Sequence, residues 1–145
     1  MAAAVSVPGL EKSLGLEILS SLHAAAESVV SKLKAETAAG SAVSAGTSVV
    51  ELRCGDAFGT ANEWAPSCNV CFCTTTCFSD DLYKKLLIVI ETLFTEGTKL
   101  IVTTSDLKSK RLKLVGKPEK HSYGAKGGRL KFFVYTVVGS CTTAN

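Results

Sequence analysis

The chain has 145 residues, of which 46% are hydrophobic and 20% charged, and its net charge is +3. This length suits one domain with its own core, and the hydrophobic content is too high for a disordered protein. No apolar run is long enough for a signal peptide or a membrane span, so we expect a protein made in a cytosol without a membrane partner.

The first element predicted is an amphipathic helix over residues 10–37, after a mobile segment 1–9. Apolar residues recur there at helical spacing: Leu14, Ile18, Leu22, Ala25, Val29 and Leu33. A small-residue linker over 38–46 follows, then a strand over 47–54 and a loop over 55–66.

A cysteine-rich segment over 67–78 is the most distinctive part of the chain. Its β-branched and aromatic residues predict a strand with Cys71, Cys73 and Cys77 on one face. Same-face neighbours on a strand lie about 7 Å apart, too far for a disulfide. A Cys71–Cys73 bond is therefore not expected, and any disulfide should run to Cys54, to Cys141 or to another chain.

The chain has one further cysteine, Cys68, which makes six in all. Three states of these cysteines remain open: buried free thiols, disulfides within or between chains, and a metal site. The spacing matches neither paired zinc knuckles nor ferredoxins, so no metal or other cofactor is predicted. A redox Cys-x-x-Cys site at Cys68 and Cys71 is disfavoured because the pair does not open a helix. A Cys–His dyad with His23 or His121 has little support.

A second helix should begin at Ser79, a good N-cap, with Asp80 and Asp81 in its first turn, and end at Gly97. Strands then follow over 99–104, 111–115 and 129–138, with Gly127-Gly128 as a hairpin turn. The fold class predicted is a single α+β domain with two amphipathic helices on a mostly antiparallel sheet. Its predicted core is Leu22, Val29, Leu33, Leu86, Ile90, Phe94, Phe132 and Val134.

Charge is unevenly distributed along the chain. Residues 1–96 hold 6 Lys/Arg and 11 Asp/Glu, whereas residues 97–145 hold 10 Lys/Arg and 2 Asp/Glu. Subunits with an acidic and a basic part can associate head to tail. The candidate basic interface residues are Lys108, Lys110, Arg111, Lys113, Lys117, Lys120, Lys126 and Arg129. Nucleic acid is an alternative partner, but no aromatic stacking pattern accompanies these charges.

No nucleophile elbow or phosphate loop is present, so no enzymatic activity is predicted. The layout resembles the tail-terminator (tail-completion) proteins of tailed bacteriophages. The residues that carry this resemblance are the helix over 17–33, the strands over 49–52 and after Trp64, the helix over 80–94 and the closing strand over 128–138.

The resemblance implies a structural virion protein without enzymatic activity that forms a homo-oligomeric ring at the phage neck or tail. Such a ring caps the tail tube and joins it to the head, so other virion proteins are the implied partners. The alternatives are a small nucleic-acid-binding module using the basic strands and a thiol- or metal-dependent protein.

Overall fold

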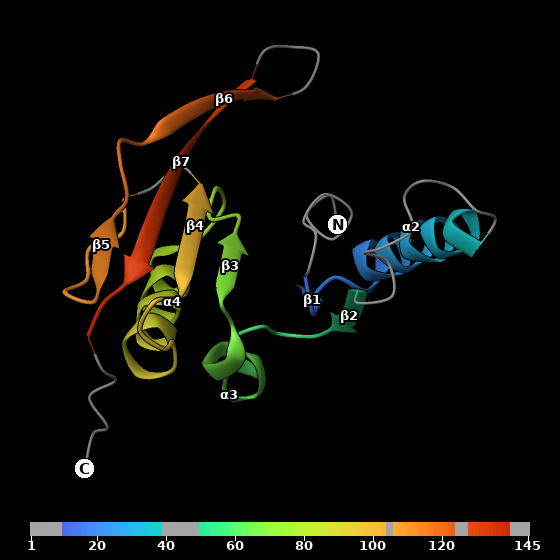
Figure 1. Cartoon of the computed structure of the whole chain (residues 1–145), viewed down its shortest axis with the longest axis horizontal. Helices are drawn as coiled ribbons and strands as arrows, with labels where there is room; N and C mark the ends of the chain where they lie inside the picture. The colour runs from blue at the N-terminus through green and yellow to red at the C-terminus, as the bar shows by residue number, and fades with distance from the viewer. Residues whose placement is uncertain (1–9, 39–49, 104–105, 124–127, 140–145) are drawn as a thin grey trace. The chain divides into compact units, whose positions relative to one another are not determined.

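A computed structural model describes residues 10–38, 50–103, 106–123 and 128–139 (Figure 1). The chain divides into two compact units, Met1–Thr60 and Ala61–Asn145, and each is described by itself. The fold class is α+β, as predicted, with helices, a two-stranded parallel sheet and a five-stranded mixed sheet. The single domain stays a prediction.

The first unit is a parallel β-α-β arrangement of β1 (Ser13–Glu17), α2 (Ser20–Ala38) and β2 (Val50–Cys54). The prediction of a helix from residue 10 is therefore wrong for its first ten residues. Gly15 explains part of the error, because a Cβ atom there would lie 2.8 Å from Leu52 Cδ2. Glycine permits close packing of β1 on β2 and is a poor helix former. Of the predicted linker over 38–46, only Ala38 is among the described residues. The first three residues of the strand predicted over 47–54 also lie outside them.

Helix α2 presents a different face to its strands from the one predicted. Among its apolar residues Val30 is buried and Leu33 half-buried, whereas Leu22 and Val29 are 53% and 44% exposed. The buried stripe of α2 is therefore displaced by about one residue from the predicted apolar stripe, with Val30 buried in place of Val29. Alanines and serines fill the flanking positions, so two neighbouring stripes are almost equally apolar and contact with β2 selects one of them.

The second unit begins with a segment predicted as loop that contains α3 (Ala61–Trp64) and a 3-10 helix, η2 (Ala65–Ser67). Both start on a buried alanine. The ring of Trp64 meets the buried ring of Phe94 edge-on at 6.0 Å between centroids. This contact anchors the short helices to the core of the second unit.

The five-stranded sheet has the order β3-β4-β7-β5, with β6 also paired to β7. Its strands are β3 (Val70–Cys73), β4 (Lys99–Thr103), β5 (Leu112–Leu114), β6 (Glu119–Tyr123) and β7 (Gly128–Val137). β3 is parallel to β4, and the three ladders of β7 are antiparallel. The sheet is thus mostly antiparallel, but the two parallel pairs, β1–β2 and β3–β4, were not predicted. β6, which was also not predicted, is the strand before the expected hairpin turn.

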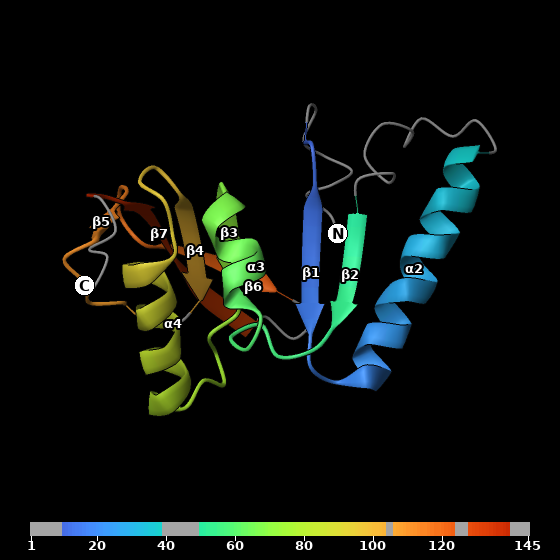
Figure 2. The ribbon, with the colours of Figure 1, turned by 90° about the horizontal axis from the view of Figure 1, so that it is seen from below.

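Helix α4 (Asp80–Thr92) lies along one side of this sheet (Figure 2). The predicted N-cap is confirmed, since Ser79 Oγ accepts the Leu82 N–H at 3.4 Å. The helix ends at Thr92 rather than Gly97. Gly97 has a φ of 91°, which favours glycine, and its N–H donates to Val137 O at 2.9 Å.

The core of the second unit lies between α4 and the sheet. Its buried residues on these elements are Leu86, Val89, Ile90, Phe94, Leu100, Val102, Phe133, Tyr135 and Val137. The prediction was right for Leu86, Ile90 and Phe94. On β7 it chose Phe132 and Val134, which are half-buried on the opposite face of the strand.

Candidate functional site

The carboxyl ends of β1 and β2 bring two acidic side chains to one edge of the small sheet. Glu17 is the last residue of β1 and is paired with Cys54, the last residue of β2. The N–H of Gly55 donates to Glu17 O at 2.9 Å, and Asp56 is the next residue. Both carboxylates therefore belong to the edge at which ligands bind in open parallel sheets.

Local hydrogen bonds hold both carboxylates. Glu17 Oε1 accepts the N–H of Leu19 at 2.8 Å, and Asp56 Oδ1 accepts the N–H of Phe58 at 2.9 Å. Glu17 is half-buried and Asp56 exposed. Each carboxylate thus orders the turn that follows its strand.

The basic residues of the two strands are engaged elsewhere. Lys12, just before β1, and Arg53 both form ion pairs with Glu51, and these hydrogen bonds lower the pKa of the Glu51 carboxyl. The edge formed by Glu17 and Asp56 is consequently acidic. It offers acceptors for hydroxyl or amine donors of a ligand. We did not predict these two residues, because residues 10–19 were assigned to a helix. The signal that was missed is an acidic residue at the end of one strand and another two residues after the end of its parallel partner.

The structure separates the cysteines predicted to share one strand face. Cys71 and Cys73 are half-buried on β3, but Cys77 is exposed in the turn before α4. β3 ends because Thr75 turns inward, where its N–H donates to Thr103 Oγ1 at 3.0 Å. Cys54 is exposed at the end of β2. Cys141 lies outside the described residues.

Hydrogen bonding with the Cys71 thiol, helped by the backbone of Val70, lowers the pKa of Cys68. Hydrogen bonding with Cys68, followed by burial, raises the pKa of Cys71 well above its ordinary value. Burial raises the pKa of Cys73 to about 11. The described cysteines are all free.

The predicted basic interface residues do not form one patch. β5 places Lys113 opposite Thr136, and β6 places Lys120 opposite Lys131, on the other face of β7. Four other members are exposed on the described surface: Lys108, Lys110, Lys117 and Arg129. Lys108 forms an ion pair with Asp106 at 2.5 Å. Lys126 lies outside the described residues.

Arg111 has a structural position rather than the predicted surface position. It is 9% exposed, and its guanidinium donates to Ile90 O at 2.7 Å, Phe94 O at 2.9 Å and Gly139 O at 2.9 Å. Two of these carbonyls belong to the carboxyl-terminal end of α4 and the residues just after it. Arg111 thus satisfies groups that the helix itself leaves without donors.

Among the residues that the structure describes, each histidine lies beside a carboxylate rather than a cysteine. His23 faces Glu27 at 3.5 Å on α2, and His121 faces Glu119 at 3.0 Å on β6. Asp81 forms an ion pair with Lys84 at 3.1 Å, in keeping with a helix terminus. Within the described ranges, no group of three His, Cys, Asp or Glu side chains is arranged to hold a metal ion.

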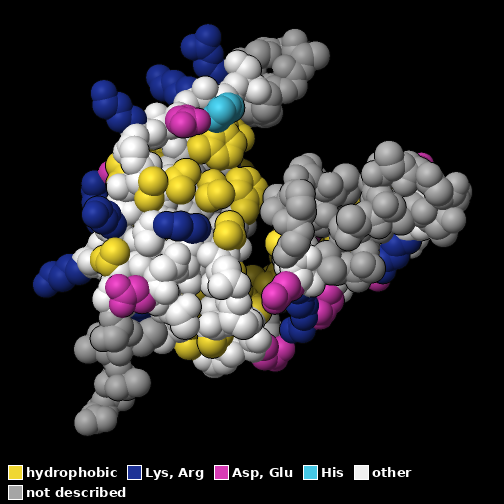
Figure 3. All heavy atoms as spheres, viewed as in Figure 1, with side chains coloured by type: hydrophobic (Ala, Val, Ile, Leu, Met, Phe, Trp, Pro, Cys, Tyr) yellow, Lys and Arg dark blue, Asp and Glu magenta, His cyan; other side chains and the backbone are white. Residues whose placement is uncertain are grey.

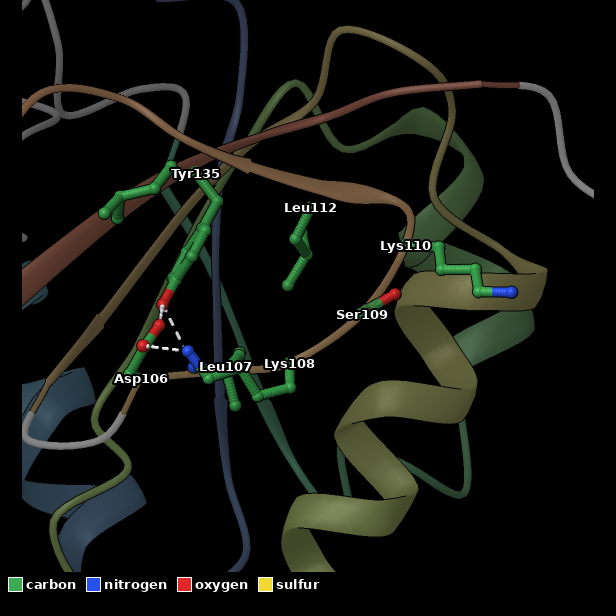
Figure 4. Close-up of a pocket in the computed structure, with 8 residues that line it drawn as sticks. Asp106, Leu107, Lys108, Ser109, Lys110, Leu112 and Tyr135 are labelled. Carbon is green, nitrogen blue, oxygen red and sulfur yellow. Dashed lines mark hydrogen bonds and ion pairs between the residues drawn. The ribbon is translucent and has the colours of Figure 1, made fainter.

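A shallow cavity of about 530 Å³ lies beside the loop before β5 (Figure 4). Its polar centre is the hydroxyl of Tyr135, which donates to Asp106 Oδ1 at 2.5 Å and accepts the Leu107 N–H at 3.0 Å. Burial, followed by the hydrogen bond to Asp106, raises the pKa of Tyr135. These hydrogen bonds hold the loop before β5 against β7.

Comparison with known proteins gives no relative: no protein-family model and no curated protein matches the chain. Among the helices that the structure describes, none combines the length and the apolar character needed to cross a membrane.

Proposed function

We propose that the edge formed by Glu17 and Asp56 binds an adenine nucleoside ligand. The observation that carries the proposal is the parallel β1–β2 pair, in which β1 ends on Glu17 and Asp56 follows two residues after β2, each carboxylate being held by a backbone N–H. In open α/β sheets ligands bind outside the carboxyl ends of the strands, where an acidic residue accepts hydrogen bonds from ribose hydroxyls.

Each carboxylate suits a different part of such a ligand. The half-buried Glu17, held by the Leu19 N–H, suits the two ribose hydroxyls. The exposed Asp56 suits the exocyclic amine of adenine, which is a hydrogen-bond donor.

The charge of the edge favours a ligand without phosphates. Anions usually bind at helix N-termini, but at the start of α2 the Leu19 N–H already bonds to the Glu17 carboxylate. Two carboxylates repel the phosphates of ATP or a dinucleotide and attract a cation. S-adenosylmethionine combines adenosine with a sulfonium cation and is therefore the ligand we expect. The reaction class that follows from this ligand is methyl transfer.

Calorimetric titration of the whole chain tests the proposal. We expect S-adenosylmethionine to bind more tightly than ATP, and Glu17→Gln to weaken its binding about ten- to hundred-fold, the effect of losing a charged hydrogen-bond acceptor. Glu36→Gln, at an exposed position on α2, is the matched control and should bind like the unchanged chain. Equal binding by the Glu17 variant, or no binding of any adenosine ligand, would refute the proposal.

A ring-forming neck or tail protein of a tailed phage is the second candidate function. It is favoured by the open face of the five-stranded sheet, on the side away from α4, which exposes apolar side chains (Figure 3). Val70 and Phe72 are 60% and 59% exposed, and Phe72 stacks on Phe132 at 6.4 Å between ring centroids. An apolar groove of about 370 Å³ continues along this face to Val115 and Val134.

A second copy could cover this face with α2. That helix exposes its own apolar side chains, Leu22 and Val29, beside Glu27, while Lys117 borders the groove. Contacts between unlike surfaces of identical chains are head to tail and close into rings when the rotation permits.

Native mass spectrometry distinguishes this candidate. We expect an oligomer at low salt that Phe72→Ser converts to monomer, because a polar side chain removes the centre of the apolar face. Ile88→Ser is the matched control, since Ile88 is also 59% exposed but lies on α4. A monomer of the unchanged chain at high concentration would exclude the ring.

A further inference from the structure

We propose that the two-stranded ribbon formed by β6 and the first half of β7 binds duplex DNA through its cationic face. Lys120 on β6 lies directly opposite Lys131 on β7, and Arg129 is two residues along β7 from Lys131. Because side chains alternate along a strand, these three cations share one face of the ribbon. The ribbon belongs to the second unit, so this proposal does not depend on the nucleoside-binding edge of the first unit.

The ribbon extends past the other strands of its sheet. β4 pairs with residues 132–136 of β7 and β5 with residues 135–137, whereas β6 pairs with residues 128–132. Among the described strands, β6 is therefore the only neighbour of residues 128–131 (Figure 1). The major groove of B-DNA, about 12 Å wide, admits a two-stranded β-ribbon of this kind.

The positive charge of this face is available to a ligand. All three cations are exposed, and within the part of the chain that the structure describes none forms an ion pair with a carboxylate. Glu119, the acidic residue of β6, lies on the opposite face, where its Oε2 atom is 3.0 Å from His121 Nε2. Asp106 attracts Lys131 from a distance, but its own hydrogen bonds go to other side chains.

The cross-strand pair of Lys120 and Lys131 costs stability unless an anion joins it. Like charges directly opposite each other destabilise a sheet. The ammonium group of Lys131 lies over the ring of the buried Phe133, 4.7 Å from the ring centroid, and this contact orders the side chain beside its like-charged neighbour. A phosphate between the two ammonium groups offsets their repulsion, and DNA supplies phosphates at close, regular spacing.

Duplex DNA fits this face better than other polyanions. The face presents hydrogen-bond donors, since the hydroxyl of Ser122 lies opposite Arg129 beside the cations. Phosphate oxygens and the guanine atoms N7 and O6 in the major groove are the matching acceptors. The major groove of duplex RNA is too deep and narrow for side chains to read, and single strands are bound by exposed aromatic rings. An acidic peptide would not require the projecting ribbon.

The anisotropy of a short labelled DNA duplex, titrated with the whole chain at several salt concentrations, tests the proposal. We expect the logarithm of the association constant to fall with the logarithm of the salt concentration with a slope of about −2.7, since each of three neutralised phosphates contributes about −0.9. Lys120→Gln, Arg129→Gln and Lys131→Gln should each reduce this slope by about one. Lys113→Gln removes the same charge from the other face of the sheet and is the matched control.

Lys120→Glu separates DNA binding from folding. It places an opposite charge beside Lys131, so we expect an equal or higher melting temperature together with a loss of DNA affinity of about ten-fold or more. Equal losses of affinity in Lys113→Gln and Lys120→Gln would overturn the proposal, as would the absence of DNA binding at low salt. Duplex RNA or polyglutamate that binds as tightly as the DNA would also contradict it, because neither requires a ribbon in the major groove.

Discussion

Replacing Arg111 by methionine is expected to lower the free energy of unfolding by about 3–5 kcal/mol, the range for removing a buried charged donor from several acceptors. The side chain is buried, and its guanidinium donates to carbonyls of α4 and of the segment after β7. Methionine has similar length but no donor, so these carbonyls would be left unsatisfied.

Chemical denaturation measures this effect. Arg111→Lys should recover only part of the loss, because an ammonium group cannot reproduce the planar fork of donors. Lys110→Met is the control, since Lys110 is the exposed neighbour in the sequence. Equal stability of the two methionine variants would show that Arg111 does not hold the end of α4.

Tyr135→Phe is expected to cost about 2–4 kcal/mol, because it removes a hydrogen bond to a carboxylate and leaves a buried N–H without an acceptor. The lost partners are Asp106 Oδ1 and the N–H of Leu107, which is 6% exposed. The loop before β5 should then detach from β7. Faster amide exchange at Leu107 in the variant would report this local opening.

The same variant has an expected pH dependence. Hydrogen bonds from Lys108 and then Tyr135 lower the pKa of Asp106 below its ordinary value of 3.8. A carboxyl whose pKa is lowered in the folded state contributes stability above its unfolded pKa and loses it as the pH falls through the folded pKa. The stability difference between Tyr135→Phe and the unchanged chain should therefore narrow below about pH 3.8. A difference that is constant down to pH 2 would exclude Asp106 as the partner.

Local sequence signals predicted the parts of the fold that depend on local chemistry. The Ser79 N-cap and the acidic first turn of α4 were found because capping involves residues only three positions apart. The alternation of β3 was also found, with Cys71 and Cys73 on one face and Val70 and Phe72 on the other.

Signals that depend on distant partners were missed. Both faces of β7 are apolar, with Phe132 and Val134 on one and Phe133 and Tyr135 on the other, so only packing against α4 identifies the buried face. The same ambiguity explains why the wrong face of α2 was predicted to be buried. The candidate site at Glu17 and Asp56 depends on the parallel pairing of β1 with β2. The paired residues are 37 positions apart, so their spacing in the sequence does not reveal the pairing.

Amide NMR mapping of adenosine and S-adenosylmethionine binding tests the central claim most directly. On titration, the amide signals expected to shift most are those of Leu19, Gly55 and Phe58, whose N–H groups bond to Glu17 or Asp56. With 2′-deoxyadenosine, which lacks one ribose hydroxyl, the shifts near Glu17 should require a higher concentration. Unchanged signals at these three amides, or shifts confined to the loop around Leu107 and Ser109, would contradict nucleoside binding at the carboxyl ends of β1 and β2.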